Sequence, residues 1–571
     1  MPAETIAAPA QTTPAPAQTA AAPAPKPAAP AQTIAAPAQT TAAPAQTIAA
    51  PAQTIAAPAQ TTAAPPQTAV APPHPKIAPA EQTVQLQVDA KAKGTPFPHF
   101  WEQMFGSGRA VLSLREDYRK DLDAVHDATG FQYVRFHDIF GRDVGLVQHG
   151  KDGKITYNFS YVDQIYDGLL AHGVKPFVEL SFMPRPLSSD PSQHQSFWYH
   201  PNVMPPKSYA EWDAMIRAFA KHLVKRYGID EVASWYFEVW NEPNLDFWGG
   251  VPRQASYFTL YDNTARALKS VSPRIRVGGP ATAQAAWVPA FLAHLHKAKV
   301  PIDFVSSHVY GDDTAENVLH KQENIPRKDM VCDAVAKVHK EILASPYPKL
   351  PLIFSEYNAS YANLPNVTDT VFMGPWLANT IRACAGNVEM MSYWTFSDVF
   401  EEQGVPKTPF YGGFGLIAEY RIDKPAFNAF AMLHRLGEVR LPLKSGSALA
   451  TRRTDGALVL ALWNYAPPVG DGPTYTPGPP KGTTKHFEIR FVHLAAGATA
   501  TVWRLDATHG NVIATFDKMG RPAFPSRTQI EELRAAGHPA NAQQITLSDD
   551  RLALDIPPQG LVVVEVKGSV K

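Results

Sequence analysis

The stretch Ser234-Trp-Tyr-Phe-Glu-Val-Trp-Asn-Glu-Pro-Asn-Leu-Asp-Phe-Trp-Gly249 decides how the rest of this chain is organised. Its aromatic and β-branched residues predict a buried strand over residues 235–240. Proline at position 243 has no N–H to contribute to a sheet, so the strand must end there and a loop must begin. We therefore expect the side chains of Asn241 and Glu242 to point into a cleft where the strand opens into the loop.

Short apolar segments alternate with amphipathic helical patterns from residue 99 onward. In one of these patterns Trp212, Ile216, Phe219 and Leu223 share a helical face after Ser208, a predicted N-cap. The alternation is typical of a parallel α/β fold, and the strand candidates fit a closed (β/α)8 barrel better than an open sheet. The candidates are residues 100–102, 131–137, 174–180, 235–240, 275–278, 304–308, 352–356 and 391–396.

The chain is predicted to have three regions. We expect a tail over residues 1–80, the barrel over residues 81–438 and a β-sandwich domain over residues 439–571. Beyond residue 440 the pattern changes to alternating strands separated by turns, with no convincing long helix, as is typical of a sandwich. Residues 83–89 alternate with a period of two and predict a strand that belongs either to the barrel region or to the sandwich.

The motif Ala-Pro-Ala-Gln-Thr recurs in the tail at positions 8, 15, 29, 36, 43, 50 and 57. Its spacing of seven resembles a coiled-coil heptad, but a proline in every repeat prevents a helix from propagating. We expect a disordered, polyproline-rich segment that acts as a spacer or tether, or as a passive extension. Met1 is followed by no signal-peptide pattern, so a cytoplasmic location is the default, and a periplasmic or extracellular one would require another start site.

Composition excludes several classes of function. Lys plus Arg and Asp plus Glu both number 52, so the formal net charge is zero and the basic excess needed to bind nucleic acid is missing. With only Cys332 and Cys384, the chain has too few cysteines for a disulfide framework and no Cys/His cluster with zinc spacing, so no metal and no cofactor are expected. No apolar run is long enough to span a membrane. A neutral sugar or polymer suits this balance better, and an oligomer is compatible with it.

Polar residues follow many of the predicted strands, at the end where barrel enzymes place their active sites. Glu242 ends the fourth predicted strand and Glu356 the seventh, and two carboxyls flanking a scissile bond are what glycoside hydrolysis requires. Position alone leaves the inverting and retaining mechanisms both open. The other candidate binding residues are His137, Asn241, His308, Tyr310, Trp394, Glu401 and Glu402.

Two segments carry a resemblance to a known family. Trp240-Asn-Glu-Pro-Asn-Leu245 and Phe354-Ser-Glu-Tyr-Asn358 resemble the acid/base and nucleophile segments of glycoside hydrolase family 39, which contains β-xylosidases and α-L-iduronidases. The resemblance covers roughly residues 95–570 and implies a barrel paired with a sandwich. It also implies a retaining mechanism with Glu242 as acid/base and Glu356 as nucleophile. Asp138 stands where the family would have glycine.

For the remaining candidates, the resemblance implies roles in holding the sugar. Asn241 would bind the sugar 2-hydroxyl, and Trp394 would form a stacking floor. His137, His308 and Tyr310 match positions that orient the sugar or the nucleophile.

The preferred interpretation is that the chain is a β-xylosidase that releases xylose from xylo-oligosaccharides. Acidic residues around the eighth strand, Asp398, Glu401 and Glu402, suit a neutral sugar, and Lys407 is expected to be the only nearby cation. The alternatives are an α-L-iduronidase, a β-glucosidase, an arabinosidase, a non-catalytic carbohydrate-binding protein, or a surface protein whose function lies in the repeat tail.

Overall fold

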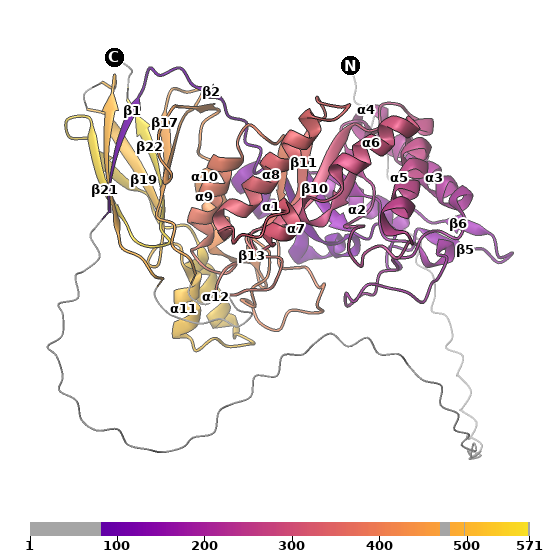
Figure 1. The fold of residues 1–571 in the computed structure, drawn as a ribbon. Helices are drawn as coiled ribbons and strands as arrows, with labels where there is room; N and C mark the ends of the chain where they lie inside the picture. The colour runs from indigo at the N-terminus through magenta and orange to yellow at the C-terminus, as the bar shows by residue number, and fades with distance from the viewer. Residues whose placement is uncertain (1–81, 469–479, 496, 569–571) are drawn as a thin grey trace, which may run out of the picture. The chain divides into compact units, whose positions relative to one another are not determined.

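The computed structural model describes residues 82–468, 480–495 and 497–568. Eight strands pair in parallel and close into a barrel in the order β10-β11-β12-β3-β4-β7-β8-β9, with helices around them (Figure 1). This confirms the predicted (β/α)8 barrel. The strands are β3 (Met104–Arg109), β4 (Tyr133–His137), β7 (Lys175–Glu179), β8 (Tyr236–Glu238), β9 (Arg276–Thr282), β10 (Phe304–Tyr310), β11 (Leu352–Asn358) and β12 (Met390–Tyr393).

The first predicted strand was wrong. Residues 100–102 lie in a turn, and the first barrel strand is β3, which begins at Met104. Two glycines in β3 prevent its prediction from residue propensities, because glycine is depleted in strands. Both are required by close packing: a Cβ on Gly106 would overlap the ring of Trp394, and one on Gly108 would lie 2.6 Å from the carbonyl oxygen of Phe400.

Helices cover the outside of the barrel, and the predicted apolar stripes face inward. Trp212, Ile216 and Phe219 of α3 are fully buried, and the hydroxyl of Ser208 accepts the N–H of Glu211 at 3.4 Å as the N-cap. A disulfide between Cys332 and Cys384 joins α8 to α9. The helices are α1 (Glu116–Thr129), α2 (Ser160–Ala171), α3 (Tyr209–Tyr227), α4 (Ile229–Val232), α5 (Arg253–Val271), α6 (Val288–Ala298), α7 (Ala315–Leu319), α8 (Arg327–Leu343), α9 (Met373–Cys384) and α10 (Pro425–Leu433).

Two sheets form the sandwich and enclose their own apolar core. The three-stranded sheet contains β1 (Gln82–Asp89), β18 (Lys485–Val492) and β21 (Arg551–Ile556), and β1 pairs with β18 in parallel. The seven-stranded sheet runs β2 (Thr95–Pro96), β15 (Val439–Arg440), β16 (Ala448–Arg452), β17 (Leu458–Trp463), β22 (Leu561–Lys567), β19 (Thr499–Leu505) and β20 (Gln543–Thr546). Trp463 and Leu561 of this sheet belong to the same apolar cluster as the barrel, which fixes the two parts together.

Two helices, α11 (Val512–Lys518) and α12 (Arg527–Gly537), interrupt the sandwich between β19 and β20 (Figure 1). The sequence pattern predicted strands and turns with no convincing long helix, and these two short helices are an addition to it. Phe516 of α11 packs on Phe410 at 4.9 Å between ring centroids, so the pair covers a loop of the barrel that follows β12. Ser526 and Gln529 form a capping box at the start of α12, a local signal that the sequence does contain.

Shorter strands lie outside these sheets: β5 (Val147–His149) pairs with β6 (Ile155–Tyr157), and β13 (Ile417–Ala418) pairs with β14 (Ile422–Asp423). Among residues 82–468, 480–495 and 497–568, every helix is too short or too polar to cross a bilayer. The repeat tail predicted over residues 1–80 lies outside the described residues.

Candidate active site

A cavity of about 370 Å3 opens at the carboxyl ends of the barrel strands. Its wall combines carboxyl groups with aromatic rings, including Phe197, Phe247 and Tyr361. None of these three aromatic residues was predicted from the sequence. The predicted residues that line it are His137, Asn241, Glu242, Tyr310, Glu356, Trp394 and Glu402. His308 and Glu401 are not part of the wall.

Glu242 is placed by an unusual backbone after β8. Its φ is +42°, and that of Trp240 is +75°, a left-handed conformation that non-glycine residues rarely adopt. Two hydrogen bonds hold it: the N–H of Glu242 donates to the carbonyl of Ala281 at 2.8 Å, and the indole of Trp240 donates to the carbonyl of Phe247 at 2.7 Å. Such local strain persists only where the surroundings fix it, and it often marks a functional site.

Glu242 and Glu356 face each other across the cavity. One carboxylate oxygen of Glu242, one of Glu356 and a ring nitrogen of His308 all lie within 4.8 Å of one another. Retaining glycosidases hold their carboxyls about 5–5.5 Å apart, whereas inverting enzymes separate them by about 6.5–9.5 Å to admit a water. This oxygen-to-oxygen distance is compatible with the retaining spacing.

Both oxygens of Glu356 accept a hydrogen bond from a buried donor. Nη1 of Arg135 donates to Oε1 at 2.7 Å, and the hydroxyl of Tyr310 donates to Oε2 at 2.6 Å. Charge-assisted bonds of this kind stabilise and orient an ionised carboxylate.

Arg135 organises the floor of the site. This fully buried guanidinium donates from Nε to Glu238 Oε2 at 2.6 Å and from Nη2 to Asn241 Oδ1 at 2.9 Å, and Nη2 also pairs with Glu179 Oε2 at 2.7 Å. With Glu356 on Nη1, each of its three nitrogens is occupied. Arg135 therefore connects β4, β7, β8 and β11, and it fixes Asn241 and Glu356 relative to each other.

His308 lies between the two carboxyls and the floor of the site. Burial holds the pKa of His308 well below its usual value, so the ring is neutral and carries one hydrogen. Its Nδ1 is 3.0 Å from Oε1 of Glu242, and its Nε2 is 3.1 Å from Ser355 Oγ and 3.4 Å from Nη2 of Arg135. His308 thus links Glu242 to the hydrogen-bond network of Arg135.

Burial and then the negative charge of Glu356 raise the pKa of Glu242 well above its usual value, which favours the protonated carboxyl. Two carboxyls in one site with different protonation states can act as an acid and a base.

His137, Glu402 and Trp394 form the opposite wall. Nδ1 of His137 is 2.7 Å from Glu179 and its Nε2 is 3.5 Å from Glu402 Oε1. Burial opposes protonation of His137, but the charge of Glu179 outweighs it and raises the pKa to about 10, so the ring is a cation. Its centroid lies 4.8 Å from that of Trp394, whose ring occupies the space that Gly106 leaves open.

Comparison with known proteins shows which family the chain belongs to. The family model described as glycosyl hydrolases family 39 matches residues 84–550. The chain belongs to this family. A β-xylosidase from Geobacillus stearothermophilus is 38% identical over 473 residues, 81% of this chain and 90% of that protein. A β-xylosidase from Caldicellulosiruptor saccharolyticus is 35% identical over 486 residues, 82% of this chain and 95% of that protein.

A solved structure is also similar. The crystal structure of a monomeric β-xylosidase from Caulobacter crescentus CB15 superposes with a TM-score of 0.77 at 36% sequence identity. The match covers 85% of this chain and 99% of that one. The chain is therefore a family 39 glycoside hydrolase with the barrel and sandwich described above.

Asp138, where family 39 was expected to have glycine, keeps a glycine-like backbone. Its φ is +68°, and its side chain is buried. The N–H of Phe182 donates to its carboxyl at 3.3 Å, and its own N–H donates to Ser181 Oγ at 3.2 Å. Burial and the nearby charge of Asp143 raise the pKa of Asp138 to about 8. The substitution thus fastens the loop after β4 to the loop after β7.

Glu401 and Asp398 have partners that the sequence did not reveal. Glu401 pairs with Arg115 at 2.6 Å and with Arg109 at 3.4 Å, so a substrate would compete with two arginines for it. Asp398 is fully buried and pairs with Lys424 at 3.1 Å, away from the cavity wall. The expectation that Lys407 is the only nearby cation was wrong, because the end of β3 was missed and Arg109 with it.

Proposed function

We propose that this family 39 hydrolase is a retaining β-xylosidase that releases xylose from xylo-oligosaccharides, with Glu242 as acid/base and Glu356 as nucleophile. The observation that carries the proposal is the carboxyl pair itself. Burial and then its neighbour's charge raise the pKa of Glu242, whose Oε1 lies 3.0 Å from His308 Nδ1, and Glu356 accepts a hydrogen bond through each of its oxygens. The similarity to two β-xylosidases over four fifths of the chain supports the choice of sugar.

In the first step, an oxygen of Glu356 attacks the anomeric carbon and forms an ester bond to it. The bond between that carbon and the leaving oxygen breaks, and Glu242 gives its proton to the departing group. The charge of Glu356 disappears in the ester, and with it one cause of the raised pKa of Glu242. In the second step, the ionised Glu242 takes a proton from water, which attacks the same carbon and restores Glu356.

The surrounding residues position the sugar. Asn241 accepts from Arg135 through Oδ1, which leaves its Nδ2 hydrogens to donate to a sugar hydroxyl. Glu402 and the cationic His137 offer an acceptor and a donor on the other side of the cavity. Trp394, beside His137, provides an apolar face for the ring.

The charges around the cavity favour a neutral sugar over a uronate. Among the described residues that line it, none is Lys or Arg, whereas Glu402, Asp312 and Asp313 add acidic groups to the catalytic pair. Arg135 is occupied on every nitrogen, and Arg109 is engaged by Glu401 and Asp143. The cationic ring of His137 does line the cavity, but it lies between the carboxylates of Glu179 and Glu402. Binding a ring carboxylate in a desolvated site calls for a cation able to form new hydrogen bonds.

Three measurements test the proposal. Turnover should be highest on an aryl β-xyloside when it is compared with the matched β-glucoside, α-L-arabinoside and α-L-iduronide. A 2-fluoro xyloside with a good leaving group should label the peptide containing residues 354–358 once, and NMR should show the β-anomer forming first. Labelling at another peptide, or initial release of the α-anomer, would exclude this mechanism. Sugar binding without turnover would instead support the non-catalytic alternative.

A further inference from the structure

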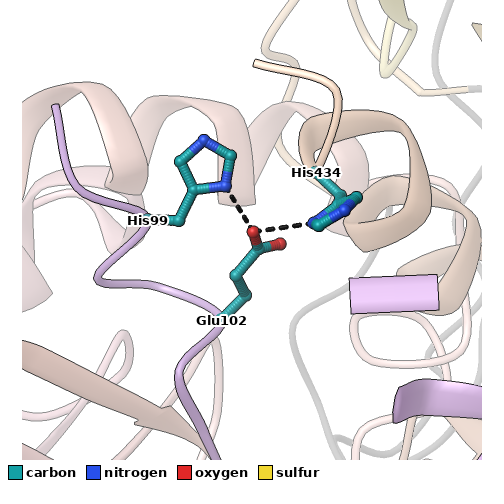
Figure 2. Close-up of side chains that lie close together, drawn as sticks. All are labelled: His99, Glu102 and His434. Carbon is teal, nitrogen blue, oxygen red and sulfur yellow. Dashed lines mark hydrogen bonds and ion pairs between the residues drawn. The ribbon is translucent and has the colours of Figure 1, made fainter. Parts of the chain in front are cut away.

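A second group of ligating side chains lies on the amino-terminal side of β3, the end of the strand opposite the one that leads into the catalytic cavity. His99 and Glu102 come from the turn that precedes β3, and His434 directly follows α10 (Figure 2). Nδ1 of His99 is 2.5 Å from Glu102 Oε1, and Nδ1 of His434 is 2.8 Å from the same oxygen. Three side chains with potential metal-ligand atoms, from opposite ends of the barrel sequence, therefore lie together.

The carboxylate of Glu102, at the centre of this group, has fewer hydrogen-bond partners than is usual for a buried charge. Glu102 is 3% exposed, and within the described part of the chain its Oε2 has no hydrogen-bond partner. Neither does it pair with a lysine or arginine among those residues; its ion pairs are to the two imidazoles. A buried carboxylate normally has each oxygen bonded, so this one has unused capacity for a cation.

The group is accessible from outside. It lines a surface hollow of about 620 Å3, and the side chain of His434 is 46% exposed, so the group opens onto the surface on its His434 side. Two arginines of this hollow are occupied elsewhere: Arg453 pairs with Glu565 at 3.0 Å, and Arg435 lies 4.0 Å from the ring centre of Trp503.

We propose that His99, Glu102 and His434 bind one divalent transition-metal ion such as Zn2+, with water completing the coordination. Two imidazole nitrogens, a carboxylate oxygen and an open fourth position form a donor set that zinc accepts. On a tetrahedral ion with bonds of about 2.0–2.1 Å, each imidazole nitrogen would lie about 3.3 Å from the carboxylate oxygen, farther than the 2.5 and 2.8 Å observed. The half-exposed ring of His434 can make that adjustment, while His99 stays stacked on Trp101 at 4.4 Å.

The location suggests what the ion does. It would connect the entry to the first barrel strand with the end of the last barrel helix, where the two ends of the barrel sequence meet. Active-site chemistry occurs at the other face of such barrels, and conserved features at this face serve stability. An ion that binds only the folded chain stabilises it in proportion to its affinity and concentration.

The test uses full-length, tag-free protein that has been dialysed against a chelator. Calorimetric titration with Zn2+ should show one tight site per chain, and saturating Zn2+ should raise Tm by about 2 °C or more without lowering turnover. His434→Gln keeps a donor for Glu102 but removes the imidazole, and Glu102→Gln removes the charge. Each should weaken Zn2+ binding by about 10-fold or more, since even an outer partner of a metal ligand is worth that much.

Because the chain has 19 histidines, a matched control is needed. His172→Ala removes another surface histidine that pairs with a carboxylate, Asp123, and it should leave Zn2+ affinity unchanged. Glu242→Gln tests the one other described group with suitable donors, which is the active site. Binding that survives His434→Gln, or binding that is lost in Glu242→Gln and accompanied by inhibition of the parent enzyme, would overturn the proposal. Circular dichroism and the metal-free Tm establish that each variant is folded.

Discussion

The hydroxyl of Tyr310 donates a hydrogen bond of 2.6 Å to Oε2 of Glu356, the oxygen that Arg135 does not reach. The two donors hold the carboxylate from different strands, Tyr310 at the end of β10 and Arg135 on β4. The proposed nucleophile is therefore oriented by two donors from different strands rather than by a single contact.

Tyr310→Phe should lower kcat on an aryl xyloside about 10- to 100-fold, the worth of one hydrogen bond to a charged group of about 1.5–3 kcal/mol. The fold should be unaffected, because the ring is retained. Steady-state kinetics with Tm as the control would check this. An unchanged kcat would mean that Arg135 alone orients Glu356.

Glu242→Ala should reduce turnover of substrates with poor leaving groups by about 10²- to 10⁴-fold, because general acid catalysis supplies that much. Activated aryl xylosides, which leave without a proton, should lose far less in the first step. Azide should then speed their turnover by attacking the glycosyl-enzyme. Equal losses on both substrate types without azide rescue would remove Glu242 from the acid/base role.

The pH dependence follows from the raised pKa of Glu242. The acid must be protonated for the first step, so kcat/KM should fall as pH rises through this pKa, and the raised value extends activity toward neutral pH. In Glu356→Gln the neighbouring charge is gone, so the pKa of Glu242 should be lower. Carbon-13 NMR of labelled glutamate would measure the shift. A pKa that stays constant or rises would show that Glu356 does not control Glu242.

The disulfide between Cys332 and Cys384 should stabilise the barrel by joining α8 to α9 across a sequence separation of 52 residues. In the chain-entropy model a loop of this size is worth about 4 kcal/mol, so the double variant Cys332→Ala/Cys384→Ala should show a clearly lower Tm at unchanged kcat. The parent protein should have no thiol that reacts with Ellman's reagent until it is unfolded with a reductant. One reactive thiol in the native protein would contradict the bond.

The sequence predicted the barrel and its carboxyl pair because both depend on local patterns. Glu242 and Glu356 each follow an apolar strand within a short motif, and a strand end is where a barrel places its chemistry. Arg109 was missed because Gly106 and Gly108 conceal its strand, and their packing against Trp394 and Phe400 is visible only in three dimensions.

Other features depend on contacts between residues distant in sequence. His434 meets Glu102 across most of the barrel sequence, so no ligand spacing could indicate that cluster. Similarly, Asp398 was expected to face a sugar, but a buried Lys424 from a later segment binds it. Charge alone does not reveal which carboxylates are already paired.

Glu402 provides the sharpest test of the sugar. Its carboxyl lines the cavity, and it is buried beside the cationic His137, with Oε1 at 3.5 Å from Nε2. Glu402→Ala should lower kcat/KM for a β-xyloside by a factor that corresponds to about 2–4 kcal/mol of transition-state stabilisation. The reason is that a sugar hydroxyl that donates to Glu402 would lose a charged acceptor.

The matched control is its neighbour in the chain. Glu401→Gln, whose carboxylate is held by Arg109 and Arg115, should change kcat/KM much less than Glu402→Gln does. Because both variants lose one acidic charge, the comparison separates a direct contact with substrate from a general effect of charge around the cavity. An equal effect at both positions would mean that Glu402 acts through its charge and not through a direct contact with the substrate. A gain in α-L-iduronide turnover in Glu402→Gln, without a loss on the xyloside, would show that this carboxylate repels anions but does not bind xylose.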